Sequence, residues 1–168
     1  LIRSATCVQH TKFDYKDGTS IEAIWRFKTR CAMIRLVIVD DHRLVREAWK
    51  LLLSRDPRIS VVAVCEGGQQ AIDAARTLQP DVMMMDITME PINGVEATRL
   101  IREFDSLIKI LGVSVHSDLA HVNAIMNAGA NGYVTKNSAG EEMIFAIMEL
   151  FEGRRYIGKE IRGYEAPE

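Results

Sequence analysis

Polar residues that could do chemistry follow several short apolar runs along the chain. Asp40 and Asp41 follow the run LVIV, and Asp86 follows the run VMMM. Ser114 and Lys136 come at the ends of two later runs of the same kind. If the three carboxylates cluster, they repel one another unless a cation lies among them. An all-oxygen donor set of this kind favours Mg²⁺ that keeps several waters.

These side chains meet only if the apolar runs are strands of one sheet. The runs cover residues 36–39, 61–64, 82–85, 110–115 and 132–135. Each is short and apolar throughout, which is typical of a strand buried on both faces. Helical spacing separates the runs. Leu44, Ala48, Leu51 and Leu52 predict a helix after the first run, and similar patterns occur within 71–78, 97–104, 122–126 and 144–151.

Five alternations of strand and helix predict an α/β fold of (βα)5 type, with a parallel sheet and right-handed crossovers. Ligands of such sheets bind beyond the carboxyl ends of the strands. We therefore expect the five polar groups at one edge of the sheet. The segment DDHR stands where a dinucleotide-binding protein has a glycine-rich turn, and its carboxylates argue against a dinucleotide site.

Composition excludes several classes of protein. The 168 residues carry a net charge of −2, with +3 on residues 1–32 and −5 on the rest, so a large phosphate-binding surface for nucleic acid is not expected. No apolar run approaches the length of a membrane span, and no secretory signal is apparent. The three cysteines form no CxxC pair, which fits unpaired thiols in a reducing, cytoplasmic compartment.

The chain is expected to divide into three parts. Residues 33–152 hold the strand and helix alternation and form the main domain. Residues 1–32 are interpreted as an N-terminal extension that forms either a small hairpin around Asp17 and Gly18 or a disordered segment. The sequence leaves open whether this extension belongs to the native protein. Residues 153–168 are interpreted as a C-terminal tail or the start of a linker.

Four motifs together resemble a known family. VIVDDH, MMMDITM, GVSVHS and AGANGYVTK are similar to motifs of the receiver domain of bacterial two-component response regulators, the CheY-like group. The segments DDHRLVRE, GVEATRLIR and EGRRYIGKEI resemble the NarL/LuxR-type subfamily, particularly its GacA/UvrY-like regulators. The resemblance implies a flavodoxin-like, doubly wound sheet with strand order 2-1-3-4-5.

The resemblance also implies a metal-dependent phosphorylation site. Asp86 matches the aspartate that accepts a phosphoryl group from a sensor histidine kinase. Asp40, Asp41 and Asp86 match the carboxylates that hold Mg²⁺, and the backbone carbonyl of Thr88 would be a further ligand. Such a protein is not an enzyme on other substrates, because it promotes only its own aspartyl phosphorylation and dephosphorylation.

Three further residues match the machinery that responds to the phosphoryl group. Lys136 matches the lysine that bonds the phosphoryl oxygens, Ser114 the switch hydroxyl, and Tyr133 the aromatic residue that changes rotamer. NarL/LuxR-type regulators continue into a helix-turn-helix domain, for which this chain is too short. Its expected output is therefore a changed surface or a homodimer, with no direct contact to nucleic acid or membrane.

Each assignment has a plainer alternative. Ser114 could satisfy its own strand-end backbone, Lys136 could be a solvated loop charge, and Tyr133 could be a packing residue. His42 and His116 are interpreted as surface loop residues.

Two other functions remain open. One is an interaction module that acts without phosphorylation. The other is a haloacid-type phosphohydrolase, which needs an aspartate two residues after the nucleophile, where this chain has Thr88.

The loop after the acceptor departs from the family pattern. Glu90 stands where the family usually has proline, and the proline is displaced to Pro91. The shape of this loop and its docking with a kinase are therefore less certain than the acceptor itself.

Overall fold

The structure is a computed structural model that describes residues 33–161. The expectations for residues 1–32, and for the tail after residue 161, lie outside the described residues. None of the helices within the described range combines the length and the apolarity needed to cross a bilayer.

A six-stranded parallel sheet forms the centre of the described domain, with the order β2-β1-β3-β4-β5-β6. The strands are β1 (Ile34–Val39), β2 (Ile59–Cys65), β3 (Val82–Asp86), β4 (Lys109–Ser114), β5 (Gly132–Thr135) and β6 (Tyr156–Ile157). Every residue of β3 and β5 is buried, as expected for strands covered on both faces. The predicted (βα)5 fold and the order of its first five strands are confirmed.

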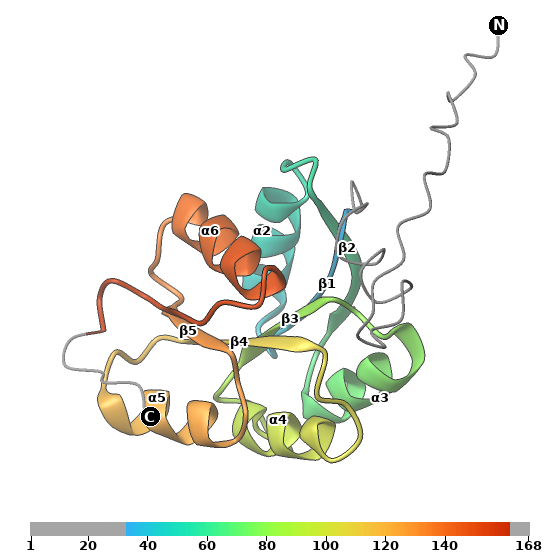
Figure 1. The fold of residues 1–168 in the computed structure, drawn as a ribbon, viewed down its shortest axis with the longest axis vertical. Helices are drawn as coiled ribbons and strands as arrows, with labels where there is room; N and C mark the ends of the chain where they lie inside the picture. The colour runs from blue at the N-terminus through green and yellow to red at the C-terminus, as the bar shows by residue number, and fades with distance from the viewer. Residues whose placement is uncertain (1–32, 162–168) are drawn as a thin grey trace, which may run out of the picture. The chain divides into compact units, whose positions relative to one another are not determined.

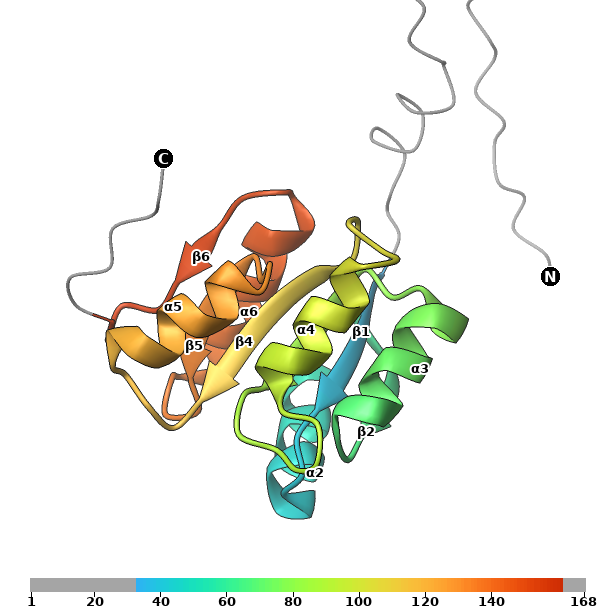
Figure 2. The same ribbon diagram turned by 90° about the horizontal axis from the view of Figure 1, so that it is seen from below.

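Helices cover both faces of the sheet (Figures 1 and 2). The helices are α2 (Arg43–Leu53), α3 (Gly68–Leu78), α4 (Gly94–Arg102), α5 (Leu119–Asn127) and α6 (Gly140–Phe151). One core lies under α2 and α6, where Trp49 and Met143 are buried, and the other lies under α3, α4 and α5, where Ala71, Ala97 and Val122 are buried. These two cores fix the strands and so fix the residues at their carboxyl ends.

Helix α2 forms where it was predicted, but two of the leucines that predicted it lie on its exposed face. Leu44 and Leu51 are 80% and 63% exposed, whereas Trp49 and Leu53 are buried. Arg46 shares the buried face, because its guanidinium bonds groups at the end of the sheet. The apolar pattern of α2 does not mark its buried face, because a paired arginine takes part in that face.

Strand β6 was not predicted. Tyr156 and Ile157 pair with β5, inside a segment that the sequence analysis assigned to a tail or linker. Side chains support this strand, since Thr135 donates to Glu160 (2.6 Å) and the Tyr156 hydroxyl donates to Glu142 (2.9 Å). A two-residue strand carries too short a pattern to be recognised from sequence.

The start of α4 packs directly on the end of β3. A Cβ added to Gly94 would lie 2.0 Å from the carbonyl oxygen of Asp86. We expect Gly94→Ala to lower the free energy of unfolding by about 1–3 kcal/mol, the usual cost of forcing an extra methyl group into a packed site. Chemical denaturation of both proteins measures this loss.

A matched control is Gly67→Ala, at the start of α3. An added Cβ there would meet its nearest neighbour, the Glu90 carbonyl oxygen, at an ordinary 3.8 Å. Gly67 is also extended, with φ of −177°, so alanine should be tolerated. Equal stability losses in the two variants would contradict a specific close approach at Gly94.

Candidate functional site

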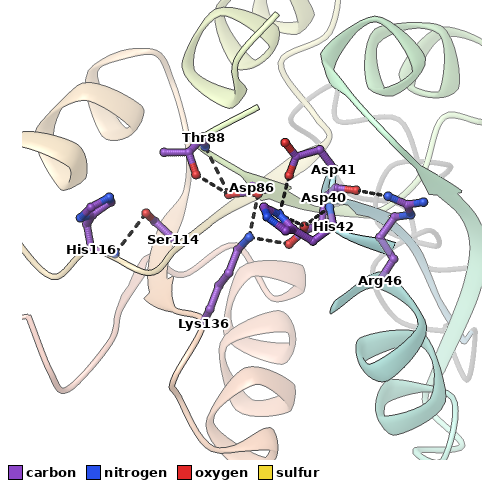
Figure 3. A network of polar contacts seen from close by, with 9 residues as sticks. All are labelled: Asp40, Asp41, His42, Arg46, Asp86, Thr88, Ser114, His116 and Lys136. Atoms are coloured by element: carbon purple, nitrogen blue, oxygen red, sulfur yellow. Dashed lines mark hydrogen bonds and ion pairs between the residues drawn. The ribbon is translucent and has the colours of Figure 1, made fainter. Parts of the chain in front are cut away.

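The polar residues predicted from sequence converge at the carboxyl ends of the strands. Val39 of β1 pairs with Met85 of β3, so Asp40 and Asp86, the next residue of each chain segment, lie side by side. Figure 3 shows Asp40, Asp41, Asp86 and Lys136 grouped at this edge. One ligand atom from each of Asp40, Asp41, Asp86 and His42 lies within 4.8 Å of the others.

Lys136 joins two of the buried carboxylates. Its Nζ lies 2.6 Å from Asp40 Oδ2 and 2.7 Å from Asp86 Oδ2. The Lys136 side chain is 11% exposed, and the two carboxylate side chains are 4% and 0% exposed. Lys136 is therefore not a solvated loop charge, and its ammonium offsets charge that burial would otherwise make costly.

Burial and charge act in opposite directions on this cluster. Burial raises the pKa of Asp86 above its ordinary value, the hydrogen bond and charge of Lys136 oppose that rise, and Asp40 adds to it. Burial disfavours the charged form of Lys136, but its hydrogen bonds to Asp40 and Asp86 outweigh burial and raise its pKa. At neutral pH the ammonium is thus firmly protonated.

The donor set fits Mg²⁺. Asp40 is buried, and one of its oxygens accepts a hydrogen bond from the His42 backbone N–H (2.8 Å), which fixes the carboxylate. Asp41 is more exposed and lies 2.7 Å from the His42 ring. Asp86 Oδ1 accepts from the backbone N–H of Thr88 (3.2 Å), which places that loop beside the acceptor. Three grouped carboxylates, one of them partly exposed, form the kind of hard oxygen site that Mg²⁺ prefers.

Ser114 and Tyr133 share one partner, the backbone of His116. The His116 N–H donates to Ser114 Oγ (3.2 Å), and the Tyr133 hydroxyl donates to the His116 carbonyl oxygen (2.5 Å). Both side chains are fully buried, and burial raises the pKa of Tyr133. Ser114 thus satisfies its strand-end backbone here, which was the alternative weighed from sequence.

Sequence reasoning missed Arg46, which supports the acidic pair. Its Nη1 donates to the Asp40 carbonyl oxygen (2.7 Å), and its Nη2 donates to Glu66 (2.7 Å). The Arg46 side chain is only 8% exposed, so its hydrogen bonds fix the turn between β1 and α2 from the interior of the domain. The available signal was helical spacing, since Arg46, Trp49 and Leu53 lie at i, i+3 and i+7.

Comparison with known proteins identifies the family. Residues 36–148 match the response regulator receiver domain. The chain belongs to the response regulator receiver family. The matched range contains all the predicted site residues, from Asp40 to Lys136, and so all three aspartates of the carboxylate cluster.

Receiver relatives are similar to this chain at moderate identity. It is 40% identical to the transcriptional regulatory protein DegU of Brevibacillus brevis, over 74% of this chain and 52% of that protein. It is also 40% identical to the response regulator GacA of Pseudomonas aeruginosa, over 77% of this chain and 60% of that protein. This receiver chain therefore spans between half and two thirds of the length of these curated relatives.

Solved structures of LuxR-family and NarL receivers share the fold. A two-component response regulator of the LuxR family from Aurantimonas sp. SI85-9A1 aligns with a TM-score of 0.75 and 38% identity, covering 77% of this chain and 93% of that one. The receiver domain of the putative response regulator NarL from Mycobacterium tuberculosis aligns with a TM-score of 0.70 and 29% identity, covering 73% and 98% of the two chains.

Proposed function

We propose that this receiver accepts a phosphoryl group on Asp86 from a sensor histidine kinase, in a Mg²⁺-dependent reaction, and then changes conformation to control an output. One observation carries the proposal: Lys136 bonds both Asp40 and Asp86 at the end of the sheet, where the carboxylates meet. This arrangement gathers a nucleophile, an ammonium group and metal-ligating oxygens around one position.

The reaction asks for little covalent chemistry from the protein. An oxygen of Asp86 attacks the phosphorus in line, an O–P bond forms, and the P–N bond to the kinase histidine breaks. Phosphoryl transfer of this kind depends on positioning and charge stabilisation. Mg²⁺ would be held by Asp40, Asp41, Asp86 and the Thr88 carbonyl, and it would supply further positive charge to the phosphoryl oxygens.

The residues that bond the new phosphoryl group provide the free energy of the switch. Ser114 and Lys136 would each form one charge-assisted hydrogen bond, at about 1.5–3 kcal/mol each, or about 3–6 kcal/mol together. Moving an equilibrium from 1:99 to 99:1 needs about 5.5 kcal/mol. Ser114 Oγ also accepts from the His116 N–H, so a reorientation of this hydroxyl toward the phosphoryl group would couple that group to the loop.

The relatives support a proposed output and proposed partners. Because DegU is a transcriptional regulatory protein, we propose that this receiver serves transcription regulation. Its direct partners would be a sensor histidine kinase and, as one form of output, a second copy of the chain. Tyr133 would report the switch through its bond to His116.

Labelling with a small phosphodonor tests the proposal. We expect the full chain, incubated with acetyl phosphate and Mg²⁺, to gain the mass of one phosphoryl group, as measured by intact-mass spectrometry. EDTA should prevent the gain, because removing Mg²⁺ leaves the phosphoryl charge to Lys136 alone.

The remaining outcomes separate the alternatives. A folded chain that gains no mass under any metal condition would favour the interaction module that acts without phosphorylation. Continuous release of phosphate over many turnovers would favour a phosphohydrolase. Labelling that is equally fast in EDTA would remove Mg²⁺ from the proposal.

A further inference from the structure

A second group of metal-ligating side chains lies beyond Ser114, on the loop that leads from β4 into α5. One ligand atom from each of His116, Asp118 and His121 lies within 4.8 Å of the others. The His116 and His121 rings are stacked, with centroids 4.4 Å apart and an interplanar angle of 11°. Figure 3 shows His116 on the far side of Ser114 from the acidic residues, so this group is separate from the first site.

We propose that His116, Asp118 and His121 form a second metal site, which binds a divalent transition-metal ion of the zinc class rather than Mg²⁺. Two imidazole nitrogens and one carboxylate oxygen are donors that Zn²⁺ accepts, whereas Mg²⁺ prefers oxygen alone. This inference goes beyond the proposed phosphorylation, because none of the three side chains that would bind the ion is assigned to that reaction.

The separations between the donor atoms suit a small tetrahedral ion. Zn–N and Zn–O bonds of about 2.0–2.2 Å place tetrahedral ligands roughly 3.3–3.5 Å apart. His121 Nδ1 lies 2.8 Å from Asp118 Oδ2, and no pair in the group exceeds 4.8 Å. To bind one ion, the two stacked rings must rotate so that a nitrogen of each faces it; His116 and Asp118 are exposed and His121 is half-buried, which leaves room for that rotation.

The carboxylate is already oriented by the helix. Asp118 is the N-cap of α5, and its Oδ1 accepts from the backbone N–H groups of Ala120 and His121. That bonding leaves Oδ2 directed at the His121 ring. A ligand held by a second set of hydrogen bonds is better oriented for a metal. The positive end of the α5 dipole disfavours a cation, and the Asp118 charge offsets it.

His116 is held by its backbone rather than by its ring. Its N–H and carbonyl bond Ser114 and Tyr133, so the imidazole is free to bind a metal while the main chain stays fixed. Three protein ligands leave a fourth position for water, as in open zinc sites. Because these ligands are exposed or half-buried, we expect weaker binding than in closed structural sites.

Calorimetric titration with zinc chloride tests the site. The full chain is titrated in excess Mg²⁺, which fills the oxygen site and leaves the nitrogen-containing one. We expect the unmodified chain to bind one more equivalent of Zn²⁺ than the double variant His116→Ala, His121→Ala. Asp118→Asn replaces a charged direct ligand, so it should weaken binding at least as much as the roughly 10–100-fold that loss of an outer-shell partner costs a metal site, while the amide oxygen still caps α5.

His42→Ala is the matched control, because it removes an imidazole from the first cluster and leaves the second intact. It should retain the zinc equivalent. On the unmodified chain, paramagnetic Co²⁺ should shift the ring-proton NMR signals of His116 and His121, a readout that needs no substitution. If the double variant binds Zn²⁺ with the same stoichiometry and affinity, or the unmodified chain binds no additional equivalent, the site does not exist.

Discussion

Asp86→Asn should abolish phosphoryl labelling by acetyl phosphate, because the amide oxygen is too weak a nucleophile to replace the carboxylate. Intact mass should then show no added phosphoryl group under conditions that label the unmodified chain fully. Asp73→Asn is the control, since Asp73 is an exposed carboxylate on α3 whose contacts are local to its helix. Labelling that persists in Asp86→Asn but disappears in Asp73→Asn would overturn the assignment.

The same variant should not lose stability. Burial raises the pKa of Asp86 in the folded protein, so the ionised carboxylate costs folding free energy above that pKa. Asparagine removes this cost, while Lys136 keeps its bond to Asp40. We expect the unfolding free energy at neutral pH in EDTA to equal or exceed that of the unmodified chain. A functional loss in a folded protein would thus be separated from misfolding.

Lys136→Gln should have the largest effect on stability. It leaves the Asp40 and Asp86 carboxylates buried without their cation, and breaking a buried ion pair typically costs about 3–5 kcal/mol. Urea denaturation in EDTA at neutral pH measures this loss. Lys50→Gln, at an exposed position on α2, should change stability little.

The loss of unfolding free energy in Lys136→Gln should depend on pH and on Mg²⁺. Without Lys136 the pKa of Asp86 rises further, and a raised folded pKa gives stability that is present at low pH and lost as pH rises through it. The deficit of Lys136→Gln should therefore shrink as pH falls toward the unfolded value, about 4. Mg²⁺ should also reduce the stability deficit of Lys136→Gln, because it would bind the folded state.

A double variant distinguishes the ion pairing of Lys136 from its packing. If the cost of Lys136→Gln comes from an unpaired carboxylate, Asp86→Asn added to it should recover much of the stability, and the two effects should not be additive. Additive losses would mean that the lysine acts through its packing alone.

The sheet could be predicted from the sequence, because each of its first five strands contains a short, mostly apolar run. The run VMMM predicted a strand at 82–85, and β3 covers Val82–Asp86, with the four apolar residues and Asp86 all buried. Once five such strands lie parallel, their carboxyl ends must share an edge, so the convergence of Asp40, Asp86 and Lys136 followed from topology alone.

The features that were not predicted from the sequence depend on which side chains contact one another in the folded chain. Arg46 is buried because two oxygens, one of the Asp40 backbone and one of Glu66, receive its guanidinium. The stacked rings of His116 and His121 meet only after α5 has formed at its observed position. Helical spacing places Arg46 on the same face as Trp49 and Leu53, but no sequence pattern names the partners of Arg46 or brings the two histidine rings together, because these contacts form only in the folded chain.

The peptide unit of His116 ties the hydroxyls of Ser114 and Tyr133 to one short piece of backbone. Neither hydroxyl can exchange its partner without disturbing the backbone that holds the other, so their rearrangements should be concerted. Time-resolved probes placed separately on the two side chains should then relax with a single common rate constant.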